Sequence, residues 1–199
     1  MADHSAAPLR VAVIVGSTRE GRSGPVVAGW VAGHARQHGE MDVDLIDLAA
    51  HPLPTVLPAF GTMPSDETIG RLRAVTPRLQ AADAFVVVTP EYNHSFPAPL
   101  KNLIDWHNQQ WHAKPVAFVS YGGVSGGLRA VEALRLVFAE VHAVTIRNTV
   151  SFSHHGDKFD GEGRAVDPDS DTAAKALLDQ LAWWAHATRD AKSARPYTG

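Results

Sequence analysis

A turn rich in glycine, serine and arginine follows the first apolar run of the chain. The run ends at Val15, and Gly16-Ser-Thr-Arg-Glu-Gly-Arg-Ser-Gly24 comes next. A helix is expected from Pro25, because proline has no N–H and a first helical position needs none. Free N–H groups and a partial positive charge at a helix N-terminus bind anions. The turn therefore predicts a phosphate seat, formed by Ser17, Arg19, Arg22, Ser23, Gly24, Pro25 and Val26.

Two other nucleotide-binding motifs fit this turn less well. It departs from the P-loop of nucleoside triphosphatases by one residue, since Arg22 stands where that motif needs a lysine. Asp47 would suit a magnesium ligand, but the third expected strand ends without the aspartate of such a site. The Gly-x-Gly-x-x-Gly fingerprint of dinucleotide-binding folds is missing. A single phosphate fits the turn better, and a structural turn without a ligand is the remaining alternative.

Two further loops complete a pattern along the chain. One reads Thr89-Pro-Glu-Tyr-Asn-His-Ser-Phe-Pro-Ala-Pro-Leu-Lys-Asn-Leu-Ile-Asp-Trp106, and the other Ser120-Tyr-Gly-Gly-Val-Ser-Gly-Gly127. Together with the first turn, and in this order, they resemble the NADPH-dependent FMN reductase family of flavodoxin-like proteins. That family includes quinone, azo and chromate reductases. The resemblance extends over roughly residues 9–150.

The resemblance implies an FMN-containing enzyme that takes electrons from NADPH or NADH. It implies that Ser17, Arg19 and Ser23 hold the phosphate, and that two backbone loops form a flat wall for the ring, with little side chain in the way. The cofactor performs the chemistry, so no side chain is assigned as catalytic. The cofactor-binding residues expected in these two loops are Pro90, Glu91, Tyr92, Asn93, His94, Ser120, Tyr121, Gly122 and Gly123.

Several of these residues have a structural alternative. Tyr92 could pack beneath the sheet edge, and Asn93 could occupy a tight turn. Glu91 is expected to be structural, because hydride transfer to a flavin needs no proton abstraction from carbon. His94 departs from many members of the family, which often have tryptophan or glycine there. Its imidazole could face the flavin ring, the nicotinamide or the solvent, and the sequence leaves all three open.

The histidines do not predict a metal site. His154 and His155 stand beside Asp157, but adjacent side chains point apart on an extended chain. Large aromatic residues are harder to assign. The resemblance implies a homodimer or homotetramer, so an interface and the core are both open for Trp106, Trp111 and Phe138. The tandem pair Trp183 and Trp184 is expected to anchor the last helix in the core.

Composition limits the class of protein. The 199 residues, with 45% apolar composition, suit a single domain over 1–199. A net charge of -3 offers no basic field for nucleic acid or an anionic membrane. The absence of cysteine excludes disulfides and thiolate chemistry, and no segment approaches the roughly 20 apolar residues of a membrane span. Without a signal-like N-terminus, the expected location is the cytoplasm and the expected partner a small-molecule acceptor.

The elements that position these loops alternate along the chain. Strands are expected at 11–15, 42–47, 84–89, 116–120 and 144–150, and helices at 25–38, 65–81, 99–110, 126–140 and 172–189. This predicts an α/β, flavodoxin-like three-layer sandwich with a five-stranded parallel sheet. Such sheets bind ligands beyond the carboxyl ends of their strands, where all three loops lie. Segments 48–63 and 151–169 are too long for simple connections and are expected to be functional or flexible.

The expected function is an FMN-dependent NAD(P)H oxidoreductase. It would pass hydride from reduced nicotinamide to a quinone, a similar two-electron acceptor or free flavin. A flavodoxin-type electron carrier is one alternative, although such carriers are strongly acidic and a net charge of -3 is modest. A flavin-dependent redox-sensing protein is another, and steady-state turnover would distinguish it from an enzyme.

Overall fold

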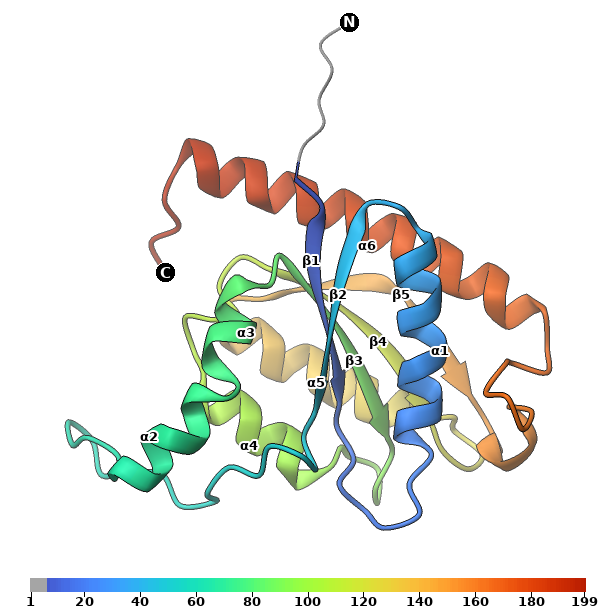
Figure 1. Cartoon of the computed structure of the whole chain (residues 1–199), viewed down its shortest axis with the longest axis horizontal. Coiled ribbons are helices and arrows are strands. Elements are labelled where there is room, and N and C mark those ends of the chain that lie inside the picture. Colours follow the sequence, from blue (N-terminus) through green and yellow to red (C-terminus); the bar gives the residue numbers. More distant parts are fainter. Residues whose placement is uncertain (1–6) are drawn as a thin grey trace, which may run out of the picture.

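The computed structural model describes residues 7–199, built on a central sheet of five parallel strands (Figure 1). Residues 1–6, part of the segment expected to lack a signal sequence, lie outside the described residues. The sheet order is β2-β1-β3-β4-β5, so the chain reverses direction across the sheet between β1 and β3. This confirms the predicted flavodoxin-like fold. The strands are β1 (Leu9–Val15), β2 (Met41–Asp47), β3 (Ala84–Pro90), β4 (Pro115–Tyr121) and β5 (Val144–Phe152).

Helices cover both faces of the sheet and give three layers. On one face, α1 (Gly24–Gln37) and α6 (Asp169–Ala194) pack over Val11, Val13 and Val15 of β1. On the other face, to which Ala12 and Ile14 of β1 point, lie α3 (Thr76–Ala81), α4 (Ala98–Trp106) and α5 (Leu128–Glu140), with α5 against β4 and β5. Every residue of β3 and β4 is buried, as expected for parallel strands covered on both sides. Burying one such valine or phenylalanine side chain contributes about 1.5–3 kcal/mol.

Two helices differ from their predicted bounds for reasons visible in the backbone. The helix expected at 65–81 is two helices, α2 (Asp66–Arg73) and α3, with Val75 between them at a non-helical φ of −120°. Pro77 lies at the start of α3, where its ring would clash with a preceding helical turn. The helix expected at 126–140 begins at Leu128, because Gly126 and Gly127 have left-handed φ of 61° and 90°.

The segment 151–169 is more ordered than its composition suggests. β5 continues to Phe152, and a short 3₁₀ helix, η1 (His155–Asp157), follows. The Phe159 ring lies 4.8 Å from that of Phe152 and 6.0 Å from that of Trp30 on α1. These aromatic contacts hold the segment against the carboxyl edge of the sheet. The last helix, α6, runs from Asp169 to Ala194 and is therefore longer than the predicted 172–189.

The segment 48–63 is tied to α4 at its proline-rich start. The amide of Asn102 donates to the carbonyl oxygens of Leu53 and Pro54 at 3.1 and 3.0 Å, and the Trp106 indole donates to Pro54 at 2.7 Å. Trp106, the last residue of α4, therefore orders a loop in this structure. The helix expected at 99–110 ends there, four residues early.

The other large aromatic residues divide between core and surface. Trp111 and Phe138 are fully buried with rings 5.4 Å apart, which assigns both to the core. The prediction for the tandem tryptophans is wrong for Trp183, whose surface is 63% exposed. Trp184 packs partly against the core, so only one of two successive helix positions faces inward.

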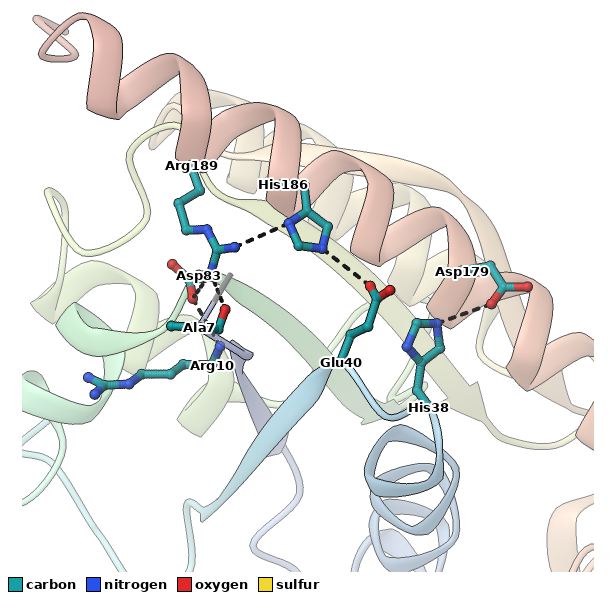
Figure 2. A network of polar contacts seen from close by, with 8 residues as sticks. All are labelled: Ala7, Arg10, His38, Glu40, Asp83, Asp179, His186 and Arg189. Carbon is teal, nitrogen blue, oxygen red and sulfur yellow. Dashed lines mark hydrogen bonds and ion pairs between the residues drawn. The ribbon is translucent and has the colours of Figure 1, made fainter. Parts of the chain in front are cut away.

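The amino edge of the sheet carries a network of polar contacts (Figure 2). Arg189 on α6 donates to the Ala7 carbonyl at 3.0 Å and lies 3.8 Å from the Asp83 carboxylate. Asp83 also accepts the Arg10 backbone N–H at 2.9 Å. A second Arg189 nitrogen donates to His186 Nδ1 at 3.2 Å. The network thus ties the end of α6 to the starts of β1 and β3.

The same network continues to β2 and α1 (Figure 2). Because His186 Nδ1 accepts from Arg189, its Nε2 carries the proton and donates to the Glu40 carboxylate at 3.2 Å. His38, which follows α1, pairs with Asp179 of α6 at 3.1 Å. No helix within residues 7–199 is long and apolar enough to cross a membrane.

Candidate functional site

A cavity of about 290 Å³ lies at the carboxyl edge of the sheet, next to the point where the strand order reverses. It brings together the turns after β1, β3 and β4, which the sequence predicted to meet. A fourth contribution comes from η1 after β5. The lining residues are Ser17, Arg19, Glu20, Gly21, Arg22, Ser23, Pro90, Glu91, Tyr92, Tyr121, Gly122, Gly123 and His155.

The turn after β1 keeps several hydrogen-bond donors uncommitted. Gly21 has a left-handed φ of 66°, which bends the turn toward the start of α1. Ser23 precedes the helix, but its side chain makes no capping hydrogen bond. The exposed guanidinium of Arg19 forms no ion pair or hydrogen bond with any residue from 7 to 199. With the first N–H groups of α1, these donors can bind an anion.

Arg22 is committed to a different partner. Its guanidinium binds the Asp47 carboxylate at 2.5 and 2.8 Å and donates to the Ser17 carbonyl at 2.7 Å. The hydrogen bond from Arg22 outweighs burial and lowers the pKa of Asp47. Asp47, considered above as a magnesium ligand, therefore fastens the first turn to the end of β2.

Two tyrosines, Tyr92 and Tyr121, line the cavity beside the turn after β1. The hydroxyls of Ser17 and Tyr92 share a hydrogen bond of 2.7 Å, so Tyr92 links the turns after β1 and β3. The Tyr121 hydroxyl is buried and has no hydrogen-bond partner among the described residues. Burial, with a smaller effect of Tyr92, raises the pKa of Tyr121 to about 12. Tyr121 is therefore a neutral hydroxyl available to a ligand.

The turn after β3 is a tight two-residue hairpin. Tyr92 and Ser95 exchange backbone hydrogen bonds of 2.9 and 3.0 Å. Asn93 and His94 between them have φ of 51° and 67°, the left-handed geometry of a type I′ turn. Asparagine and histidine are among the non-glycine residues found most often in this geometry. Both side chains are exposed and lie outside the cavity, which matches the structural alternative for Asn93 and the solvent-facing one for His94.

Glu91 joins the turn after β3 to the start of α5. Its carboxylate accepts hydrogen bonds from the Ser125 hydroxyl at 2.6 Å and from the Arg129 backbone and guanidinium at 3.1 and 2.9 Å. Burial opposes ionisation, but these hydrogen bonds prevail and lower the pKa of Glu91. A carboxylate held in this way at a helix N-terminus orders the loop, in agreement with a structural role.

The turn after β4 presents backbone rather than side chains. The Gly122 N–H donates to Phe152 at 3.1 Å, and a Cβ on Gly122 would lie 3.2 Å from the Gly127 nitrogen. A Cβ on Gly123 would meet nothing within 4 Å. The space beside Gly123 is therefore open to a ligand, as close approach to a flat ring requires.

Six of the sixteen predicted residues do not line the cavity. Asn93 and His94 lie at the hairpin tip. Ser120 is fully buried, and its hydroxyl donates to the Gly126 carbonyl at 2.9 Å. The remaining three belong to α1: Gly24 packs beneath the site, and Pro25 and Val26 line a groove between α1 and residues 161–165.

His155 is a lining residue that the sequence did not predict. It was considered only as a metal ligand, and within the described part of the chain no group of three or more histidine, aspartate or glutamate side chains is placed to hold a metal ion. His155 follows the carboxyl end of β5, which shares the sheet edge with the other three loops. That position in the parallel sheet was the available signal.

These features fit FMN. An unpartnered buried hydroxyl, an open backbone wall and a set of free anion donors lie around one cavity. In open parallel sheets, ligands bind beyond the carboxyl ends of the strands at such a reversal point. Residues 9–157 match the family described as NADPH-dependent FMN reductase. The chain belongs to this family, which confirms the predicted family, the enzyme class and the pair of cofactors at that level.

Known proteins extend the similarity. An NAD(P)H-dependent FMN reductase of Schizosaccharomyces pombe is 38% identical over 59% of this chain and 60% of its own length, so the match spans less than two thirds of that relative. A probable NADPH:quinone oxidoreductase of Oryza sativa is 32% identical over 87% of both chains. The flavoenzyme FerB of Paracoccus denitrificans superposes with a TM-score of 0.72 at 24% identity, covering 90% of this chain and 98% of FerB. This last similarity concerns the fold.

Proposed function

We propose that this chain binds FMN in the cavity at the carboxyl edge and catalyses electron transfer from NADPH or NADH to a quinone, a similar two-electron acceptor or free flavin. The observation that carries the proposal is the set of uncommitted anion donors beside a backbone-walled space. Family membership and the name of the rice relative support the choice of cofactor and acceptor.

The residues of the chain have distinct tasks in this proposal. Arg19, Ser23 and the first N–H groups of α1 hold the phosphate, and Arg22 holds the turn in shape through Asp47. Bound FMN supplies the redox chemistry, hydride uptake from reduced nicotinamide and two-electron delivery to an acceptor.

The other end of the cavity positions the ring. Gly122 and Gly123 leave its approach open, and Glu91 fixes the neighbouring loop by holding the start of α5. Tyr121 stays protonated at neutral pH and offers a hydroxyl beside the phosphate turn. In this arrangement the protein binds and orients, and no side chain has to exchange a proton with the substrate.

Oligomeric state and location belong to the same proposal. We expect a homodimer or homotetramer acting in the cytoplasm on a small-molecule acceptor, with residues 1–199 folding as one domain. Light scattering of the purified chain measures the assembly. A monomeric mass at micromolar concentration would contradict the oligomer.

Ligand specificity and kinetics test the proposal. The purified chain should bind FMN in preference to FAD, and ATP should not compete with FMN. Initial rates with NADPH and a quinone should give parallel double-reciprocal lines, because one phosphate seat implies that donor and acceptor use the same site in turn. Tight ATP binding without flavin uptake would overturn the cofactor, and intersecting lines would overturn the shared site.

The two alternative functions give different results in the same assay. A flavodoxin-type carrier would bind FMN but turn over slowly with NADPH and a quinone. A redox sensor would bind FMN without appreciable steady-state turnover. Rapid turnover with a small acceptor therefore separates an enzyme from both.

A further inference from the structure

His155 follows the edge strand β5 and is hydrogen-bonded to Gly122 at the glycine-lined side of the cavity. Its backbone N–H and its ring Nδ1 both approach the Gly122 carbonyl, at 3.3 and 3.1 Å. The ring lies edge-on to Tyr121, with centroids 5.1 Å apart. The next contact along the chain joins the His154 N–H to the Gly123 carbonyl at 3.0 Å. The imidazole is therefore held in place by the loop that it faces.

The contact with Gly122 fixes the tautomer of His155. A carbonyl oxygen can only accept a hydrogen bond, so Nδ1 carries the ring proton. Nε2 has no hydrogen-bond partner among residues 7–199, and the side chain lines the cavity. The neutral ring can accept a hydrogen bond at Nε2, and the protonated ring can donate one there.

The sheet order indicates which end of the cavity His155 serves. β5 lies three strand positions from β1, whose loop forms the phosphate seat. At about 4.8 Å per strand, that is roughly 14 Å across the sheet. His155 contacts Tyr121, the last residue of β4, and Gly122 in the turn that follows it. Its place is the end away from the phosphate seat.

We infer that His155 is a cofactor-binding residue whose Nε2 forms a hydrogen bond with the pyrimidine edge of the flavin ring and binds the reduced flavin more tightly than the oxidised one. This rests on the proposed FMN site. Negative charge appears at that edge on reduction, so a protonated imidazole there favours the reduced form. His155 would thereby raise the reduction potential most strongly in acid.

Other charged and titratable groups also face this space and set the background. Two of them are already paired, Glu91 with Arg129 and Arg22 with Asp47. A change specific to His155 must therefore be measured against a variant that leaves all of them in place. The groups are Arg19, Glu20, Arg22, Glu91, Tyr92 and Tyr121 around the cavity, and His154, Asp157 and Lys158 on the adjoining segment.

The test compares two identical substitutions at neighbouring positions. In His155→Asn the amide can still donate to Gly122, as Nδ1 does, but nothing replaces Nε2. In the control His154→Asn, asparagine enters an exposed position with a left-handed φ of 48°, which it tolerates well. A third variant, His155→Gln, returns a neutral polar group near the place of Nε2. Thermal unfolding verifies that all three fold.

Flavin affinity and reduction potential are the readouts, measured with FMN and with riboflavin at about pH 6 and at about pH 8. His155→Asn should weaken the binding of both oxidised flavins by about the same factor, up to roughly tenfold for one lost hydrogen bond. At about pH 6 the substitution should weaken the binding of reduced flavin by a further factor of about ten, which corresponds to a fall in reduction potential of about 30 mV. His155→Gln should restore the affinity for oxidised flavin but not the pH-dependent part of the potential.

Three results would overturn the inference. They are an unchanged affinity and potential in His155→Asn, an equal loss in His154→Asn, and a loss confined to FMN with riboflavin unaffected, which would place the contact at the phosphate. Failure of the wild-type chain to bind either flavin would instead refute the proposed function, so the two failures are distinguishable.

Discussion

The two edges of the sheet use the same residue types in opposite ways. At the amino edge, Arg189, His186 and Asp83 satisfy one another and the adjoining backbone (Figure 2). At the carboxyl edge, the Arg19 guanidinium and the Tyr121 hydroxyl have no partner within the described part of the chain. The first arrangement stabilises the fold, and the second retains the capacity to bind a ligand.

The two edges differ in whether these side chains have hydrogen-bond or ion-pair partners within the protein, and not in residue type. Even within one turn, Arg22 is paired with Asp47, while Arg19, three positions earlier, is exposed and has no side-chain partner among residues 7–199. Substitutions at the carboxyl edge should therefore change ligand binding at little cost in stability, and those at the amino edge should do the reverse.

The largest effect on binding is expected from Gly123→Val. A Cβ at this position meets no protein atom within 4 Å, so the fold should tolerate it, while the branched side chain fills the space proposed for the ring. FMN binding should be lost, with a melting temperature close to that of the wild type. Equilibrium dialysis and calorimetry measure the two. Full FMN occupancy in this variant would show that the ring lies elsewhere.

Lys114 gives the largest expected effect on stability at the amino edge. It is 6% exposed, and its ammonium donates to the carbonyls of Leu79 and Gln80 at 2.9 and 3.0 Å. Burial, with a smaller contribution from Lys192, lowers the pKa of Lys114 from 10.5 to about 8. Between these pH values the unfolded chain binds a proton that the native chain does not, so the free energy of unfolding rises with pH.

The rise attributable to Lys114 amounts to about 3 kcal/mol between about pH 8 and 10.5. Denaturant titrations of the wild type and of Lys114→Met measure it as the difference between two pH profiles. That difference also removes the parallel contribution of Lys192, whose pKa is lowered by burial. Identical slopes in the two proteins would contradict a buried, proton-releasing Lys114.

Arg19→Ala should weaken FMN binding by about tenfold to a hundredfold, since a charge-assisted phosphate contact contributes roughly 1.5–3 kcal/mol. Its stability should not change, because the guanidinium has no protein partner in the described residues. Riboflavin, which lacks the phosphate, should bind the variant and the wild type equally. Arg36→Ala, an exposed arginine on α1, is the matched control. Equal losses for FMN and riboflavin would remove Arg19 from the phosphate seat.

Arg189→Gln should have the smallest effect on binding. Losing contacts to Ala7, Asp83 and His186 should lower the free energy of unfolding by about 1–2 kcal/mol. The dissociation constant for FMN should change by no more than about twofold, whereas a loss of about 1.4 kcal/mol in binding would change it tenfold. Urea unfolding and flavin titration of one preparation test both. A large fall in FMN affinity would show that the two edges are coupled.

The sequence was sufficient for the order and type of the main elements and for three of the four loops at the site. Runs such as 84–89 are apolar at every position, and glycine- and proline-rich turns punctuate the chain at strand ends. Parallel strands then bring their following loops to one edge without further information. Pro77 also marked a break that the single helix predicted at 65–81 ignored.

Pairings between distant residues could not be predicted in this way. Nothing local distinguishes Arg22 from Arg19, because the carboxylate that engages Arg22 is 25 residues away. His155 finds Gly122 across 33 residues, through a register of β4 and β5 that contains a bulge. Trp183 and Trp184 are neighbouring residues of the same type, and the rotation between successive positions of α6 decides that Trp184 packs on the core while Trp183 is exposed.

The most direct test of the account is an anaerobic titration of the FMN-loaded chain with NADPH, followed by visible absorbance. If the carboxyl edge is the catalytic site, the flavin band should bleach with one equivalent of NADPH, at a rate at least equal to kcat and before any quinone is added. Gly123→Val, treated in the same way, should retain no flavin to bleach. A flavin band that persists in excess NADPH would contradict the assignment of this edge as an oxidoreductase site.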